Sequence, residues 1–379
     1  MRIEGIASVA DRLVGHTVLV RASLNVPVTA GRVGNSFRLD AALQTISFLS
    51  ARGVRVVLLS HIGDASTASL YPVYEHVRHT LPLQFVDDVV GSRAFDAVRG
   101  LKNGDVLMLE NLRRDSGEVE NDDRFTRRLA ALGDVYVNDD FAAAHRAHAS
   151  IVGLPTYLPS YAGLQFIQEL VGLAHALEPK SPSLALVGGA KFVTKEPLIR
   201  SLLTKYDQVF VGGALATDFL KAKGYEVGRS LSSASPHVAD LLTNSKILLP
   251  TDVVVENVHG REIKLVSHML ATDTIYDIGP ETLHTLQSYI QKARTILWNG
   301  PMGNFERGFS DMTENLACAV AAASGYSVVG GGDTIAAIEK LGLNNKFDFV
   351  STAGGAMLDF LAHGSLPGME ALEKSKKLA

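Results

Sequence analysis

The residues of the first half that could bind a charged ligand are cationic and neutral polar side chains placed just after expected strands. Arginine is a natural partner of carboxylate and phosphate, because its planar guanidinium donates paired hydrogen bonds. A single arginine at a strand end is ordinarily a surface residue, so the inference depends on several of them converging on one sheet edge. The set indicates a site for a multiply charged anion and comprises Arg21, Ser23, Asn25, Arg38, His61, Arg113 and Arg146.

Glycine-rich turns follow the strands expected in the second half. Glycine lets the backbone approach a ligand closely, and a helix that begins beyond the turn directs N–H groups at phosphate. One such turn could serve packing alone, but several at the carboxyl ends of parallel strands indicate a nucleotide site. The turns are Gly188-Gly189-Ala190-Lys191, Gly212-Gly213-Ala214, Asn299-Gly300-Pro301, Gly330-Gly331-Gly332-Asp333-Thr334 and Thr352-Ala353-Gly354-Gly355.

This glycine pattern differs from the two common nucleotide signatures. The sequence contains neither G-x-x-x-x-G-K-[ST] nor G-x-G-x-x-G, which argues against a P-loop and against a Rossmann dinucleotide site. Lys191 and Lys195 lie within and just after the first turn, where Thr194 and Pro197 predict a helix start. Each lysine could neutralise a transferred phosphate or be a solvated residue at a helix end. Asp333 could cap a helix or hold magnesium, directly or through water, beside phosphates.

Other chemistries have little support in the sequence. His145 and His148 have a spacing similar to that of metal ligands, but no H-E-x-x-H pattern accompanies them, so we expect them to orient the neighbouring loop. No G-x-S-x-G sequence indicates a hydrolase. The single cysteine, Cys318, excludes an internal disulfide framework. Because the N-terminus carries no basic-then-apolar export signal, we expect a cytoplasmic protein.

Size and composition limit the architecture. With 379 residues the chain is too long for one ordinary core, which predicts two domains. Its hydrophobic fraction of 46% is typical of globular proteins. The apolar runs fall short of the roughly 20 residues that span a bilayer. A net charge of −4 gives no reason to expect nucleic acid or a membrane surface as a partner.

Short β-branched runs alternate with longer amphipathic stretches along the whole chain. This alternation predicts βαβ units, and therefore parallel sheets covered on both faces by helices. The expected strands are Thr17–Val20, Val54–Leu59, Asp105–Leu109, Asp134–Val137, Leu184–Val187, Gln208–Val211, Thr295–Trp298, Ser327–Val329 and Phe347–Val350, and expected helices include Asp40–Ala51, Pro197–Lys205 and Thr334–Leu341.

The predicted fold class is α/β, with two Rossmann-like three-layer domains that each contain a parallel sheet. The prolines and glycines of Ile151–Gly163 suit a domain junction, and a helix at Leu164–Ala176 could join the halves as a hinge. We expect an anion-binding domain at 1–157 and a nucleotide-binding domain at 163–352. Phosphoryl transfer needs in-line positioning, charge neutralisation and exclusion of water, which two such domains could provide. The residues alone indicate a kinase of a small acidic metabolite.

Ordered motifs along essentially the whole chain resemble the phosphoglycerate kinase family. The resemblance implies reversible phosphoryl transfer between 1,3-bisphosphoglycerate and ADP in glycolysis, giving 3-phosphoglycerate and ATP. It also implies Mg²⁺ as cofactor with ATP or ADP, small-molecule partners only, and a monomer. The matching stretches are Asn25-Val26-Pro27, Ser60-His61-Ile62-Gly63, Leu70-Tyr71-Pro72-Val73, Glu110-Asn111-Leu112-Arg113, Val137-Asn138-Asp139, 144–150, Gly188-Gly189-Ala190-Lys191, Phe219-Leu220-Lys221, 298–303, 330–334 and Leu366-Pro367-Gly368.

The resemblance also implies a role for each site residue. Arg38, Lys191 and Gly332 are expected to be catalytic, and the C-terminal segment 358–379 is expected to cross back to the first domain. The expected phosphoglycerate ligands are Ser23, Asn25, Arg38, His61, Arg113 and Arg146. The expected nucleotide contacts are Gly189, Lys191, Lys195, Gly213, Asn299, Pro301, Glu306, Gly331, Gly332, Asp333 and Thr334, with Asp333 at the metal.

The chain departs from the family pattern at several positions. Ser23 replaces an aspartate, Asp64 an arginine of the anion patch, Thr194 an aspartate, and Ala353 a glycine. An anion beside a bound phosphate could cost about 1 to 3 kcal/mol, unless Asp64 turns away or a nearby cation such as Arg32 or Arg114 compensates. We expect an altered but working site. The alternatives are a kinase of the same fold that uses a different small acid, and a non-catalytic nucleotide-binding paralogue.

Overall fold

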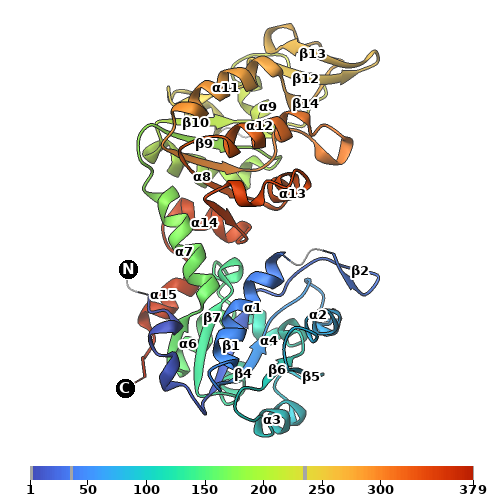
Figure 1. Cartoon of the computed structure of the whole chain (residues 1–379). Helices are drawn as coiled ribbons and strands as arrows, with labels where there is room; N and C mark the ends of the chain where they lie inside the picture. The colour runs from blue at the N-terminus through green and yellow to red at the C-terminus, as the bar shows by residue number, and fades with distance from the viewer. Residues whose placement is uncertain (1–2, 35–36, 234–236, 379) are drawn as a thin grey trace. The chain divides into compact units, whose positions relative to one another are not determined.

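Two units of alternating strands and helices make up the chain (Figure 1). The computed structural model describes residues 3–34, 37–233 and 237–378. Unit 1 comprises Met1–Leu170 together with Ser365–Ala379, and unit 2 comprises Val171–Gly364. The boundary between Leu170 and Val171 falls inside helix α7 (Leu164–Leu177).

Unit 1 is built on a parallel sheet that, within the described residues, has six strands in the order β5-β6-β4-β1-β7-β8. Every residue of β1, β6 and β7 is buried, because helices cover both faces of a parallel sheet. The strands are β1 (Thr17–Ala22), β4 (Arg55–Leu59), β5 (Leu83–Val86), β6 (Val106–Leu109), β7 (Val135–Asp139) and β8 (Ser160–Ala162), with a separate hairpin of β2 (Val28–Thr29) and β3 (Arg32–Val33). The helices are α1 (Phe37–Ser50), α2 (Tyr71–Val77), α3 (Ser92–Arg99), α4 (Ser116–Glu120), α5 (Asp123–Ala130), α6 (Leu154–Tyr157) and α15 (Pro367–Lys374).

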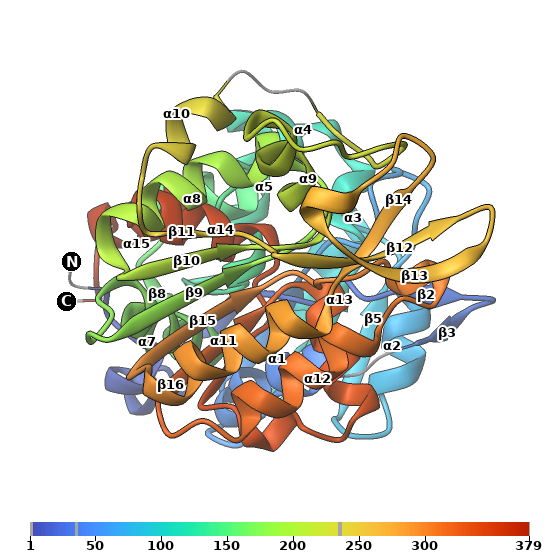
Figure 2. The ribbon, with the colours of Figure 1, turned by 90° about the horizontal axis from the view of Figure 1, so that it is seen from above.

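Unit 2 also has a parallel sheet, whose order in the described part of the chain is β11-β10-β9-β15-β16-β17. Helices α8 and α11 cover opposite faces of this sheet (Figures 1 and 2). Its strands are β9 (Ser183–Val187), β10 (Gln208–Val211), β11 (Ile247–Leu248), β15 (Thr295–Asn299), β16 (Tyr326–Gly330) and β17 (Phe349–Ser351). Its helices are α8 (Phe192–Lys205), α9 (Gly213–Ala222), α10 (Val238–Leu242), α11 (Pro280–Lys292), α12 (Asp311–Ala321), α13 (Gly332–Lys340) and α14 (Gly355–His363).

The predicted α/β class with parallel sheets in two domains is confirmed by this architecture. One local prediction was wrong, and one sheet was not predicted. Helix α8 begins at Phe192 and contains Pro197, whereas the sequence predicted a start near Thr194 and Pro197. An antiparallel sheet was also missed, in which β12 (Asp252–Asn257) pairs with both β13 (Gly260–Leu265) and β14 (Thr274–Ile278).

The C-terminal segment returns to unit 1 at Ser365, later than the expected start at Leu358. Helix α14 stays in unit 2 because Phe360 and Leu361 are buried there and the Ser201 hydroxyl donates to the Leu361 carbonyl oxygen at 2.9 Å. Beyond it, the N–H of Gly368 donates to the Ala144 carbonyl oxygen at 2.8 Å.

The return segment is fixed to unit 1 by apolar burial as well as by backbone hydrogen bonds. Met369 and Leu372 on α15 are fully buried. The N–H of Ser160 donates to the Lys376 carbonyl oxygen at 3.2 Å, and the N–H of Leu378 donates to the Tyr161 hydroxyl at 2.9 Å. The last residues of the chain therefore lie against β8 at the edge of the unit 1 sheet.

We predict that Leu372→Ala destabilises unit 1 by about 2 to 5 kcal/mol, because it removes a fully buried side chain and leaves a cavity. Urea denaturation followed by circular dichroism measures the change. The matched control is Glu373→Ala on the exposed side of the same helix, which should change the unfolding free energy by less than about 0.5 kcal/mol. Equal stability of the two variants would show that Leu372 does not contribute to the core.

Candidate active site

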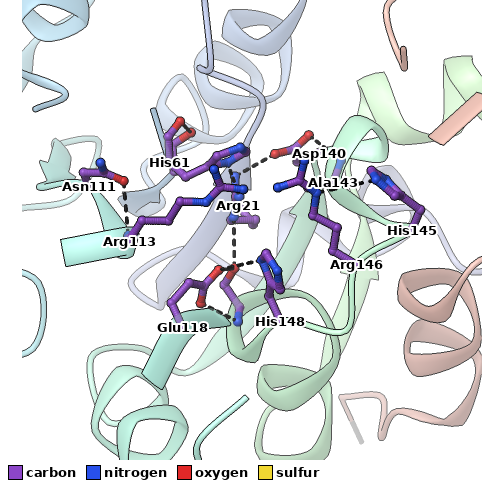
Figure 3. A network of polar contacts seen from close by, with 12 residues as sticks. Arg21, His61, Asn111, Arg113, Glu118, Asp140, Ala143, His145, Arg146 and His148 are labelled. Atoms are coloured by element: carbon purple, nitrogen blue, oxygen red, sulfur yellow. Dashed lines mark hydrogen bonds and ion pairs between the residues drawn. The ribbon is translucent and has the colours of Figure 1, made fainter. Parts of the chain in front are cut away.

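The carboxyl ends of four neighbouring strands carry the predicted anion-binding residues of unit 1. Strand β1 lies between β4 and β7, and β6 lies beside β4, so the loops after these strands meet at one sheet edge. Arg38 lies in the first turn of α1, and its side chain is outside the described residues. The loops that follow the four strands bring together Ser23, Asn25, His61, Arg113 and Arg146, and Figure 3 shows the last three of these facing the same region.

Arg21 is the centre of this edge, although the sequence analysis placed it only at a strand end and gave it no individual role. Its side chain, 1% exposed, points from the end of β1 into a set of polar partners (Figure 3). Nη1 donates to Asp140 at 2.7 Å, Nε donates to the Ser150 hydroxyl at 3.0 Å, and Nη2 lies 2.7 Å from Nδ1 of His61. A buried guanidinium needs such partners, because an unpaired buried charge is very costly.

The contact with Arg21 determines the protonation of His61. A guanidinium only donates hydrogen bonds, so Nδ1 of His61 accepts from Arg21 and the ring proton lies on Nε2. Burial, followed by the charges of Arg21, Arg113 and Arg146, lowers the pKa of His61 far below its ordinary value. His61 is therefore a neutral imidazole that can donate one hydrogen bond from Nε2 to an anion.

The buried carboxylate of Glu118 stabilises Arg21 through Ser150, which contacts both. Glu118 in α4 is fully buried and accepts from both the N–H and the hydroxyl of Ser150, at 2.9 and 2.6 Å. Burial raises the pKa of Glu118, and the charge of Arg21 opposes that rise. His148 lies 4.0 Å from the same carboxylate, and its pKa is lowered to about 4, first by burial and then by the charge of Arg146. His61 and His148 are thus both neutral at pH 7.

Arg113 is positioned by the turn that follows β6. Asn111 begins the 3₁₀ turn η3 (Leu112–Arg114), and its side-chain oxygen accepts from the N–H of Arg113 at 3.1 Å (Figure 3). Nη1 of Arg113 donates to the Gly63 carbonyl oxygen at 2.5 Å and to the Asp64 carboxylate. Its Nε is buried and has no hydrogen-bond partner among the described residues. Asp64 therefore does not turn away from the anion patch.

The remaining members of the patch differ in how firmly they are held. Arg146 is half-buried, and its Nε lies 3.5 Å from Nε2 of His145. Asn25 accepts from the N–H of Gly63 at 3.0 Å, and Ser23 is buried in the same turn after β1. Arg146 thus presents charge at the surface of the patch, whereas Arg113 is nearly buried beside Asp64 and Arg21 is enclosed beneath both.

All of the predicted nucleotide residues of unit 2 line two adjoining pockets at the carboxyl edge of its sheet. The smaller pocket has a volume of about 320 Å³ and the larger about 480 Å³, and they share Gly189, Ala190, Pro301 and Asp333. The predicted residues of the smaller pocket are Lys191, Lys195, Asn299, Gly331, Gly332 and Thr334, while the larger pocket contains Gly213 and Glu306.

Glycines serve two distinct purposes in these pockets. A Cβ at Gly188 would lie 2.1 Å from the Pro301 carbonyl oxygen, so that glycine lets two turns pack together. At Gly332 and Gly355, by contrast, a Cβ would meet nothing within 4 Å. These two residues begin helices α13 and α14 and line the smaller pocket, so the N-termini of both helices lie at that pocket. A phosphate group fits such a place.

The two predicted lysines are held very differently. Nζ of Lys195 donates to the Asn299 side chain at 2.9 Å and to the Gly188 carbonyl oxygen at 2.5 Å, and burial lowers the pKa of Lys195 to about 8. Lys191 is exposed at the N-cap of α8 and lines the same pocket. Lys195 therefore joins the ends of β9 and β15, whereas Lys191 is available to a ligand.

Asp333 is the carboxylate that lines both pockets. It lies in the first turn of α13 and raises the pKa of Lys195 against the effect of burial. Mg²⁺ in nucleotide sites is commonly held by one or two carboxylates together with phosphate oxygens and water. The residues present fit a magnesium ion that arrives with a nucleotide.

Several residues of the larger pocket were missed by the sequence analysis. They come from the missed strand β14, from the loop between α9 and α10, and from the segment after β15. No glycine or charge pattern marks them, and only the three-dimensional placement of the antiparallel sheet brings them together. They are Arg229, Leu231, Thr274, Ile275, Tyr276 and Phe305.

Comparisons with known proteins agree on one family. The model of the family described as phosphoglycerate kinase matches residues 9–364. A phosphoglycerate kinase from Moorella thermoacetica is 44% identical to the chain, and the alignment covers 94% of this chain and 95% of the relative. A phosphoglycerate kinase from Caulobacter vibrioides is 43% identical, with 95% of this chain and 97% of the relative covered.

Solved structures give the same result. The structure of phosphoglycerate kinase from Coxiella burnetii superimposes with a TM-score of 0.86 at 36% identity, covering 98% of this chain and 99% of that one. The phosphoglycerate kinase from Pyrococcus horikoshii gives a TM-score of 0.88 at 30% identity, with 98% of each chain covered. The chain belongs to the phosphoglycerate kinase family.

Proposed function

We propose that the protein catalyses reversible phosphoryl transfer between 1,3-bisphosphoglycerate and ADP, giving 3-phosphoglycerate and ATP. The proposal rests on two features that occur together in this member of the family. Unit 1 has an arginine patch, and unit 2 has glycine-lined pockets. Transfer between these substrates requires charge neutralisation and in-line positioning, with no covalent nucleophile from the protein.

Unit 1 is proposed to bind the phosphoglycerate. Arg113 and Arg146 supply positive charge for the carboxylate and phosphate, and His61 donates from Nε2. Ser23 and Asn25 lie in the turn beside them. We include Arg38 as a substrate-binding and catalytic residue on the sequence resemblance. Neutral His61 adds a directed hydrogen bond without adding to the repulsion among the arginines.

Unit 2 is proposed to bind the nucleotide. The N–H groups at the start of α13, beginning with Gly332, face the smaller pocket and suit the phosphates, while the larger pocket suits the nucleoside. Lys191 is proposed to neutralise the phosphoryl group in transfer, and Asp333 to hold Mg²⁺. When bound, the ion neutralises phosphate charge. Lys195 keeps the turns after β9 and β15 in register.

The transfer also requires that the two bound ligands meet away from water. Helix α7 contains the boundary between the units, and we propose it as the hinge for that movement. We further propose, from the resemblance, a cytoplasmic monomer. Among the described residues no helix is long and apolar enough to cross a membrane.

A second candidate function is motivated by Asp64 and Ser23. A carboxylate already bound to Arg113 could favour an acid with a different charge from 3-phosphoglycerate. A non-catalytic nucleotide-binding protein is the remaining alternative. Turnover of another acid with none of 3-phosphoglycerate would establish the first, and ATP binding without turnover of any acid would establish the second.

We predict ATP consumption that depends on both Mg²⁺ and 3-phosphoglycerate, measured with a coupled dehydrogenase that removes the acyl phosphate. Lys191→Ala should lower kcat about 100-fold or more, because it removes a charge that acts on the transferring group. Lys205→Ala, at the other end of α8, is the matched control and should keep nearly full activity. A similar loss in both variants would contradict a specific role for Lys191.

We predict that Arg38→Ala greatly lowers the rate while leaving the ADP affinity nearly unchanged, because the proposed anion site and nucleotide site lie in different units. Steady-state kinetics gives the rate, and titration calorimetry gives the Kd for ADP. Arg124→Ala, an exposed arginine on α5, serves as the control. Unchanged turnover in Arg38→Ala would overturn the proposed anion site.

We predict that His61 remains neutral, with its proton on Nε2, from pH 8 down to pH 5 in the ligand-free protein. The reason is that burial and Arg21 lower its pKa far below 6.5. Nitrogen NMR of histidine-labelled protein measures the tautomer, and the missing signal in His61→Gln assigns it. Protonation of His61 near pH 6.5 would show that Arg21 does not donate to it.

A further inference from the structure

A carboxylate of the chain itself occupies a guanidinium that the proposed substrate uses. Asp64 lies in the loop after β4 and accepts a hydrogen bond from Nη1 of Arg113. The Asp64 side chain is 95% exposed, whereas that of Arg113 is 6% exposed. The pair therefore joins a nearly buried cation to an anion that remains in solvent.

The loop that carries Asp64 is held in place by Asn111. The Asn111 side chain donates to the carbonyl oxygens of Ile62 and Ala68, both at 3.0 Å, and accepts from the N–H of Ile62 at 3.3 Å. Its oxygen also accepts from the N–H of Arg113. One amide thus fixes the loop on both sides of Asp64 and fixes Arg113, so the contact between the two charges is built into the turn.

Asp64 acts as the counter-charge of Arg113 when no ligand is bound. Burial and the neighbouring charge of Arg146 lower the pKa of Arg113, and Asp64 opposes both effects. A phosphate or carboxylate of a ligand would fill the same role. Nε of Arg113 is buried without a partner among the described residues, so Gly63 and Asp64 leave part of the guanidinium unsatisfied.

Binding an anion at Arg113 costs free energy if Asp64 stays in contact with the same guanidinium. Two negative groups on one guanidinium lie within a few ångströms of each other and repel. The Asp64 side chain can move into solvent, because it is already 95% exposed and water can solvate its charge once an anion pairs with Arg113 in its place. Whether it moves or stays, its charge opposes the acid and leaves the nucleotide pockets of unit 2 unaffected.

We propose that Asp64 is an internal competitor of the acidic substrate, which occupies Arg113 in the ligand-free site and so weakens the binding of that substrate. The inference rests on the proposed function in taking the acid to bind at Arg113. In this role, Asp64 sets the affinity for the acid but takes no part in the phosphoryl transfer.

The test compares Asp64→Asn with Asp87→Asn. Asp87 is also exposed and pairs with the next arginine, Arg114, at 2.7 Å, so its replacement makes the same change of charge without touching Arg113. Titration calorimetry without nucleotide measures the Kd for 3-phosphoglycerate and for inorganic phosphate. Only the phosphate binding that is lost in Arg113→Ala is assigned to the patch. Kinetics measures KM for 3-phosphoglycerate and for ATP.

Asp64→Asn should lower the Kd for both anions about two- to fivefold and lower the KM for the acid by a similar factor, with the KM for ATP unchanged. Asp87→Asn should change none of these values. Unchanged binding in Asp64→Asn overturns the inference. Weaker binding also overturns it, because Asp64 would then position Arg113 for the substrate, and so does the absence of any anion binding that depends on Arg113.

Turnover by the unaltered protein reports separately on the proposed function. If 3-phosphoglycerate is not phosphorylated but phosphate binds more tightly to Asp64→Asn, the role of Asp64 stands and the proposed reaction fails. If turnover is normal and Asp64→Asn resembles Asp87→Asn, the proposed reaction stands and the competition fails.

Discussion

The burial of one guanidinium constrains the whole carboxyl edge of unit 1. Arg21 lies in one of the two central strands of the sheet, where a charge must be fully paired to be tolerated. Asp140 after β7, Ser150 and His61 after β4 are each held by that requirement. The same requirement sets the proton on His61 and orders the loops that carry the proposed substrate-binding groups. The anion patch is therefore positioned by the buried charge of Arg21 beneath it.

For its proposed anionic ligand, unit 2 offers backbone N–H groups in place of several charged side chains. Gly332 and Gly355 begin helices with open space before them, and Gly188 lets neighbouring turns pack closely. Lys195 supplies one buried cation, but its hydrogen bonds go to Gly188 and Asn299. A site made of helix N-termini suits phosphates that arrive with a metal ion, since it adds little fixed charge of its own. In the proposed function, unit 1 binds an acid that arrives without a metal ion and uses arginine instead.

The sequence predicted those features that depend on local pattern. The buried strands and the glycine turns after β9, β10, β15 and β16 follow from β-branched runs and glycine spacing. The positions of the pockets follow because parallel strands place their ends together. Partners separated by long stretches of chain could not be predicted, as in the contacts of Arg21 with Asp140 and Ser150. The antiparallel sheet of β12, β13 and β14 was missed as well, and with it the outer wall of the larger pocket.

The carboxylates of the patch differ in whether a ligand can replace them. Asp140 and Glu118 are at most 1% exposed, so removing either from its partner would strand a buried charge or leave polar groups unpaired. Their interactions belong to the fold. Asp64 has the same charge but is almost fully exposed, and water can solvate it as soon as it leaves Arg113. Exposure, and not distance or charge, thus separates the anions that build the site from the one that a substrate can displace.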